Sequence, residues 1–198
     1  MKILHLISSP RGEGSFSIKL GNAIIRQLQS KYPGSTVTVR NLTADPFPHL
    51  EEVHLNSFFT PEEARSEEQV KALRHSDQAI AELVAADTIV IGVPMYNFSI
   101  HSSLKAWVDH VVRAGLTFRY SEQGVEGLVK NKKVYLAVAT GGVYSDGPMK
   151  DADFTEPYMR SILNFIGITD ITTLRVEGVA IPDMKESALQ KAVDAIAV

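Results

Sequence analysis

Cysteine is absent from this chain of 198 residues, which excludes disulfide bonds, thiol nucleophiles and thiolate metal sites. No apolar run approaches the roughly 18 residues of a membrane-spanning helix, and the apolar residues after Lys2 are typical of a strand, not of a signal peptide. Clusters of Lys and Arg are also lacking, and the net charge is −3. We therefore expect a cytoplasmic protein that binds neither nucleic acid nor a membrane.

The histidines do not form a metal-binding pattern. His49 and His54 flank two glutamates, but they lie five residues apart and would not share a helix face as the histidines of a zinc helix do. His5 falls within the first apolar segment, where a buried core residue is expected. We therefore expect no metal.

What is present is enough apolar sequence for one domain over residues 1–198, since 44% of the residues are hydrophobic. Short apolar segments predict strands at 2–7, 35–41, 88–93, 134–139 and 171–176. Segments of helical period alternate with them and predict helices at 15–32, 60–86, 101–114, 155–166 and 185–196. This alternation predicts an α/β fold with a doubly wound, five-stranded parallel sheet, strand order 2-1-3-4-5, and helices on both faces.

One long segment interrupts the alternation. Residues 42–59 have no clean period and contain proline and phenylalanine, so we expect a loop, which at this length inside a domain is more often functional than idle. The pattern Thr-Pro-Glu-Glu at 60–63 predicts the start of the next helix, with Thr as N-cap, Pro at the first position and Glu closing a capping box. That helix is expected to reach Ala86, with a break near Ser66.

Three loops follow the first, third and fourth expected strands and should meet at one edge of the sheet. The first, at 8–17, places hydroxyls and backbone amides at a helix N-terminus, which suits a phosphate as well as a plain N-cap cluster; it lacks the Walker and Gly-x-Gly-x-x-Gly patterns. The second, at 94–98, offers aromatic surface and backbone groups for a heterocycle, although such loops are often rims or interfaces. The third, at 139–142, contains two adjacent glycines, which allow close approach of a ligand or simply a turn.

These loops carry motifs that recur in order along the whole chain. The motifs are Ser8-Ser9-Pro10-Arg11-Gly12, Pro94-Met95-Tyr96-Asn97-Phe98, Gly115-Leu116-Thr117-Phe118-Arg119-Tyr120, Gly127-Leu128, Gly141-Gly142 and Phe165-Ile166-Gly167-Ile168. Together they closely resemble the FMN-dependent NADH azoreductase family of flavodoxin-like quinone reductases. The resemblance implies a flavodoxin-like fold and a homodimer that binds one FMN per subunit near the interface.

The resemblance also implies which residues hold FMN. The phosphate would be bound by Ser9, Ser15, Phe16 and Ser17. The ring would be lined by Pro94, Met95, Tyr96, Asn97 and Phe98, and its pyrimidine side by Ala139, Thr140, Gly141 and Gly142. Two positions depart from the family pattern: Phe16 stands where many relatives have a polar residue, and the segment from Thr140 to Tyr144 differs from a common Arg-Gly-Gly version.

The implied activity is two-electron transfer from NADH through FMN to quinones and aromatic azo compounds, with ping-pong kinetics. We expect no catalytic side chain, because the flavin carries the redox chemistry. Residues 118–128 predict a hairpin with its turn at Gln123-Gly124, and Phe118, Tyr120 and Tyr144 are candidate substrate contacts. An FMN electron carrier or a flavin-sensing regulator could use the same loops, so both alternatives stay open. No basic cluster suits a 2′-phosphate, which favours NADH over NADPH.

Overall fold

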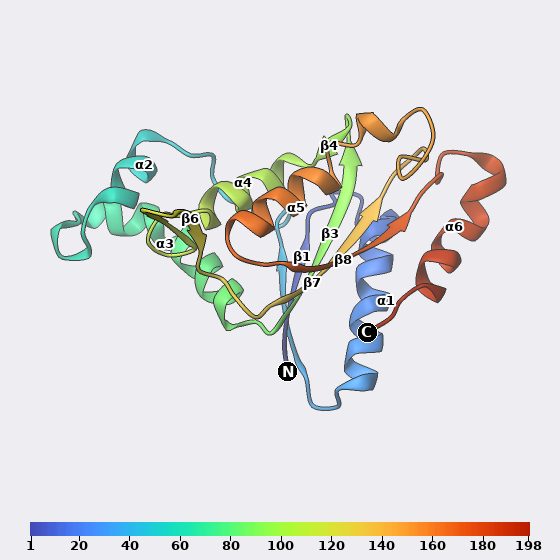
Figure 1. Ribbon diagram of the computed structural model, residues 1–198, viewed down its shortest axis with the longest axis horizontal. Coiled ribbons are helices and arrows are strands. Elements are labelled where there is room, and N and C mark those ends of the chain that lie inside the picture. Colours follow the sequence, from blue (N-terminus) through green and yellow to red (C-terminus); the bar gives the residue numbers. More distant parts are fainter.

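A parallel sheet of five strands forms the centre of the protein. The computed structural model describes all 198 residues, Met1–Val198 (Figure 1). The strand order is β2-β1-β3-β7-β8, which matches the predicted order of the five expected strands. The strands are β1 (Lys2–Ile7), β2 (Thr36–Asn41), β3 (Thr88–Tyr96), β7 (Lys133–Ala139) and β8 (Asp170–Val176). A short strand, β4 (Ser99–Ile100), pairs antiparallel with the end of β3.

Burial along the strands follows their place in the sheet. β3 is buried from Thr88 to Pro94, and β7 from Val134 to Val138, because each has a strand on both sides and helices above and below. β2 lies at the edge, and its alternating polar and apolar residues leave it largely exposed. The apolar runs therefore mark the central strands and the alternating run marks the edge.

Two clusters of buried side chains pack on the sheet. The larger contains Trp107, which is 1% exposed, and includes residues of α3 (Glu67–Ala85), α4 (Ser102–Val111) and α5 (Glu156–Phe165). The smaller includes residues of α1 (Phe16–Lys31) and α6 (Pro182–Asp194), which contact each other. In Figure 1, α1 and α6 lie to the right of the strands and α3, α4 and α5 to the left. None of these helices combines the length and the apolar character that crossing a membrane requires.

The expected loop at 42–59 was predicted wrongly, because it contains the helix α2 (Glu52–Phe59), which packs against α3. Its N-terminus is capped by a reciprocal pair: the Glu51 side chain accepts from the backbone of His54, and His54 Nδ1 accepts from the N–H of Glu51 at 3.0 Å. A Glu followed by a His is an uncommon capping pair. The helix therefore carries no common N-terminal signal in its sequence.

The predicted helix start at Thr60 is also wrong. Thr60 is the C-cap of α2: its Oγ1 donates to the carbonyl of Asn56 at 2.8 Å and accepts from the Nε2 of Gln69 at 3.1 Å, and it accepts from no backbone N–H. A single turn, η2 (Glu62–Ala64), intervenes. The capping box lies instead at Ser66 and Gln69, where Ser66 Oγ accepts from the N–H of Gln69 and Gln69 Oε1 accepts from the N–H of Ser66. The expected break near Ser66 is therefore the true start of α3.

The predicted hairpin is confirmed as β5 (Phe118–Ser121) paired with β6 (Gly124–Gly127), although its turn falls at 122–123, one residue earlier than expected. Its base is fixed to the C-terminal end of α5. A Cβ atom on Gly127 would lie 2.2 Å from the backbone nitrogen of Gly167, and Val129 N donates to the carbonyl of Ile166 at 2.8 Å. Two glycine backbones in direct contact explain why both positions lack a side chain.

Candidate functional site

A cavity of about 310 Å³ opens at the carboxyl ends of β1, β3 and β7. This volume is near the lower end of the ~300–1,000 Å³ that is typical of small-molecule sites. Most of the predicted cofactor-binding residues line it, namely Ser9, Ser15, Phe16, Pro94, Met95, Tyr96, Ala139, Thr140 and Gly141. Ser17, Asn97, Phe98 and Gly142 do not. The three loops that were singled out in the sequence therefore meet at one site.

The first loop presents unpaired backbone N–H groups to this cavity. Ser15 is the N-cap of α1; its Oγ accepts from the N–H of Ile18 at 3.4 Å and lies 3.0 Å from Oγ of the fully buried Ser17. The N–H groups of Phe16 and Ser17 have no acceptor in the protein. Free N–H groups in the first turn of a helix of 16 residues are the usual partners of a bound anion.

The second loop is shorter than expected, because β3 continues through Met95 and Tyr96, which pair with β4. Only Asn97 (φ 49°) and Phe98 (φ 69°) form the turn, and both have the left-handed backbone that a tight two-residue hairpin turn requires. Asn adopts this conformation readily, but Phe does so rarely. The Phe98 carbonyl accepts from the N–H of Phe154 at 3.0 Å, which helps to hold the turn in place.

The third loop is fixed by the segment that follows β8. The N–H groups of Gly178, Val179 and Ala180 donate to the carbonyls of Gly142, Thr140 and Gly141, at 3.0, 3.3 and 2.9 Å. The Thr140 hydroxyl is used within the loop, where it donates to the Gly142 carbonyl at 2.8 Å. The N–H groups of Gly141 and Gly142 are left without an acceptor in the protein. Gly141 lines the same cavity, so its N–H is a second donor there, and the N–H of Gly142 follows it directly in the chain.

Sequence reasoning missed four residues that line the cavity: Arg11, Val179, Ala180 and Lys185. Val179 and Ala180 could have been found from the strand order, because the loop after β8 must reach the same end of the sheet as the loop after its neighbour β7. Arg11 and Lys185 are exposed and form no ion pair, so they add positive charge to the cavity. Two sets of free N–H donors and two free cations fit a ligand with an anionic group and carbonyl oxygens, as FMN has.

Comparison with known proteins agrees with this geometry. The profile of a family described as "Flavodoxin-like fold" matches residues 1–198. The chain belongs to this flavodoxin-like family. It is 48% identical to an FMN-dependent NADH:quinone oxidoreductase 1 of Rhizobium etli, over 94% of this chain and 92% of the relative, and 45% identical to an FMN-dependent NADH:quinone oxidoreductase of Beijerinckia indica, over 99% and 97%.

Solved structures of other proteins show the same fold. An azoreductase from Bacillus anthracis superimposes with a TM-score of 0.91 at 30% identity, covering 98% of this chain and 95% of that one. An FMN-dependent NADH-azoreductase from the same species, in complex with FMN, gives 0.87 at 26% identity, covering 98% and 96%. The resemblance read from the sequence motifs is confirmed.

The three candidate substrate residues do not line the cavity of this chain. Phe118 is 8% exposed, and its ring centroid lies 4.6 Å from that of Phe165 in α5, so it packs as a core residue. Tyr120 is 74% exposed on the hairpin. Tyr144 is half-buried, with its ring centroid 6.3 Å from that of Phe98. Their roles in substrate binding stay predictions.

A histidine lies next to Tyr96, one of the residues that line the cavity. His101 is the N-cap of α4, and its Nδ1 accepts from the N–H of Ser103 at 3.2 Å. Its ring centroid lies 5.3 Å from that of Tyr96, which lines the cavity. Burial lowers the pKa of His101 below its usual value of 6.5, so the imidazole is neutral near pH 7. It therefore adds no charge next to Tyr96.

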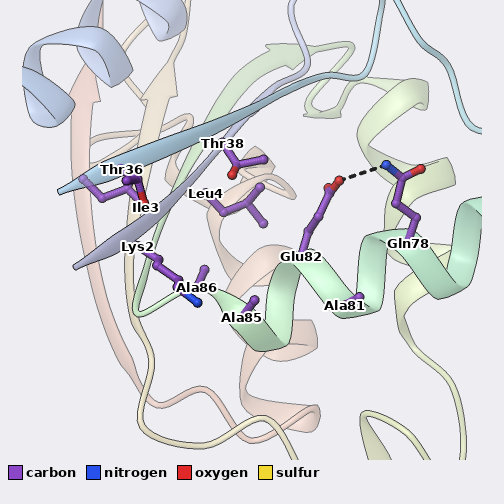
Figure 2. Close-up of a pocket in the computed structure, with 10 residues that line it drawn as sticks. All are labelled: Lys2, Ile3, Leu4, Thr36, Thr38, Gln78, Ala81, Glu82, Ala85 and Ala86. Carbon is purple, nitrogen blue, oxygen red and sulfur yellow. Dashed lines mark hydrogen bonds between the residues drawn. The ribbon is translucent and has the colours of Figure 1, made fainter.

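A second cavity, of about 460 Å³, lies at the other end of the strands, next to the amino ends of β1 and β2. Figure 2 shows it between the first residues of β1 and β2 and the last turns of α3, with Gln78 donating to Glu82 at 3.2 Å. Glu82 also pairs with Arg40 of β2. This cavity contains none of the residues that the motifs of the flavodoxin-like family single out.

Proposed function

We propose that this protein is an FMN-dependent NADH:quinone oxidoreductase that also reduces aromatic azo compounds. The observation that carries the proposal is one cavity whose lining includes two separate residues with unpaired N–H donors, Phe16 and Gly141, each followed by a residue, Ser17 or Gly142, whose N–H is also unpaired. The relatives and neighbours named above supply the activity: their names specify FMN, NADH, quinones and azo compounds.

The proposed FMN site uses the edge where parallel sheets of this kind bind ligands. We interpret the fold as doubly wound, with its switch point between β1 and β3, and the site lies there. Ser9, Ser15 and the N–H groups of Phe16 and Ser17 would hold the phosphate, and the positive charge of Arg11 and Lys185 supports an anion at this cavity. Residues 94–98 and 139–142 would contact the ring.

FMN, when bound, supplies the hydride chemistry, so the chain must bind, orient and shield it. The N–H groups of Gly141 and Gly142 are free to hydrogen-bond the pyrimidine oxygens and to stabilise negative charge there, without reorganisation at the moment of reaction. Met95 and Tyr96 are half-buried and offer apolar surface that excludes water. NADH and the electron acceptor would use the same pocket in turn, which gives ping-pong kinetics.

We further propose that residues 1–198 form one domain that assembles as a homodimer in the cytoplasm, where NADH is available. Several large apolar side chains are exposed away from the sheet, including Leu55 and Phe59 of α2, Tyr120 of the hairpin and Phe154. Phe59 is 79% exposed, and water contact with so many large apolar groups favours association. Light scattering should give twice the chain mass; a fully active monomer would contradict the dimer.

The decisive experiment is an anaerobic titration of the FMN-reconstituted protein with NADH, followed by a benzoquinone, while the flavin absorbance is recorded. We expect rapid bleaching by an equimolar amount of NADH and full recovery after the quinone is added. Repeating the titration with NADPH tests the proposed preference for NADH. Tight FMN binding without bleaching would replace the enzyme with an electron carrier or a flavin-sensing regulator. Failure to bind FMN would overturn the site itself.

A further inference from the structure

A buried cluster of charges contacts the segments next to residues 94–98 and 139–142, which we call the two ring-side walls because these residues would contact the flavin ring. Arg175, near the carboxyl end of β8, has a side chain that is only 15% exposed and faces three carboxylates. Its Nη2 lies 2.5 Å from Oδ2 of Asp153, its Nε donates to Glu156 at 3.0 Å, and its Nη1 lies 3.4 Å from Oε1 of Glu177. Burial opposes the charge on Arg175, but hydrogen bonds to Asp153 and Glu156 outweigh it and raise the pKa of Arg175.

One of these carboxylates holds the segment that follows the two glycines. Glu177 Oε1 accepts from the N–H groups of Tyr144 and Ser145, at 2.8 and 2.9 Å, and Oε2 accepts from the Ser145 hydroxyl. Tyr144 lies two residues after Gly142, and a Cβ atom on Gly142 would lie 3.3 Å from the Tyr144 ring. The position of Glu177 therefore determines where the loop at 139–142 is anchored.

A second carboxylate holds the segment that supports the tight turn after β3. Asp153 Oδ1 accepts from the N–H groups of Thr155 and Glu156, at 2.8 and 3.3 Å. Between them, Phe154 donates its N–H to the Phe98 carbonyl at 3.0 Å, and the Thr155 hydroxyl lies within 3.5 Å of the same oxygen. Asp153 therefore fixes the backbone that fastens Phe98.

We propose that Arg175 is a positioning residue that holds both ring-side walls of the flavin site through these two carboxylates, an inference that rests on the proposed function. Without the Arg175 guanidinium, three partly buried carboxylates would remain close together: those of Asp153, Glu156 and Glu177. The only cation left to balance them would be Arg160, which pairs with Glu156. Carboxylates in this position relieve their repulsion by turning towards water. Tyr144, Ser145 and Phe154 would then lose their fixed places.

The test compares FMN with riboflavin, which lacks the phosphate, by fluorescence titration of the cofactor-free protein. We expect R175M to weaken binding of both ligands by the same factor, about tenfold, because the loss falls on the ring. R175K keeps the positive charge but cannot contact all three carboxylates at once, so we expect it to restore part of that affinity. The matched control is R160M, since Arg160 also pairs with Glu156 but contacts neither Asp153 nor Glu177; its affinities should stay within about twofold.

A second measurement does not depend on flavin. Lys150 lies between the two held segments, so trypsin should cleave after it faster in cofactor-free R175M than in the parent protein or in R160M. The inference is overturned if R175M only lowers the melting temperature and leaves both affinities unchanged, or if it weakens FMN but not riboflavin. If R175M does not fold, Glu177→Gln is tested in the same way; it weakens the attachment of 144–145 and the pairing of Glu177 with Arg175 but leaves Asp153 in place. Failure of the parent protein to bind FMN would instead remove the proposed function.

Discussion

Acid should destabilise this protein through His5. The side chain lies in β1, is 2% exposed, and its Nε2 has no hydrogen-bond partner. Burial lowers its pKa from 6.5 to about 4. Between those values the unfolded chain binds a proton that the folded chain does not, so the stability that neutral His5 contributes is complete above about pH 6.5 and is lost as the pH falls towards 4. Lowering the pKa from 6.5 to about 4 corresponds to roughly 3 kcal/mol in total, of which about 2 kcal/mol is lost between pH 7 and pH 5.

The assay is urea unfolding of the cofactor-free protein at pH 7 and at pH 5. The variant His5→Leu cannot titrate, so its free energy of unfolding should fall by about 2 kcal/mol less between the two pH values than that of the parent. The exposed His49 provides the matched control, and His49→Gln should behave like the parent protein. An equal loss in His5→Leu and the parent would refute the assignment of this acid sensitivity to His5.

Three further substitutions test the packing and the site. Gly21→Ala should destabilise the protein by about 1–3 kcal/mol, although Ala usually favours a helix, because the new Cβ would lie 2.8 Å from Nε2 of His5. Chemical unfolding measures this cost, and an equal cost in the His5→Ala background would contradict the clash. Phe16→Pro keeps the start of α1 but removes a free N–H, so FMN binding should weaken about tenfold while riboflavin binding is unchanged; equal losses for both would argue against a phosphate site there. Lys185→Gln should weaken FMN binding about threefold at low salt and reduce its salt dependence; an unchanged salt dependence would exclude Lys185 from the phosphate's surroundings.

The sheet and the location of the cavity could be predicted because they depend on long, consistent patterns. The buried run of β3 and the alternation of β2 differ because one strand is covered on both sides and the other is at the edge. Once the strand order is known, the loops after β1, β3 and β7 must lie together. Most of the residues that line the cavity could therefore be named from the sequence alone.

What could not be predicted depends on contacts that no local pattern encodes. α2 begins with a cap made by Glu51 and His54, and α3 begins where the Ser66 hydroxyl accepts from the N–H of Gln69, whereas the Thr60 hydroxyl bonds the last turn of α2. Phe98 adopts a left-handed conformation that its side chain disfavours, and a hydrogen bond from Phe154, distant in sequence, helps to hold it there. In each case the tertiary structure decides between local alternatives of similar energy.

The contact between Gly127 and Gly167 limits how this fold can change during evolution. A side chain at either position would collide with the backbone of the other, so neither glycine can be replaced unless the two segments move apart together. The base of the hairpin therefore behaves as a fixed joint with the end of α5, whereas its tip at 122–123 is exposed. Insertions, deletions and new side chains at that tip would not disturb the sheet, whereas a side chain at either glycine of the joint would.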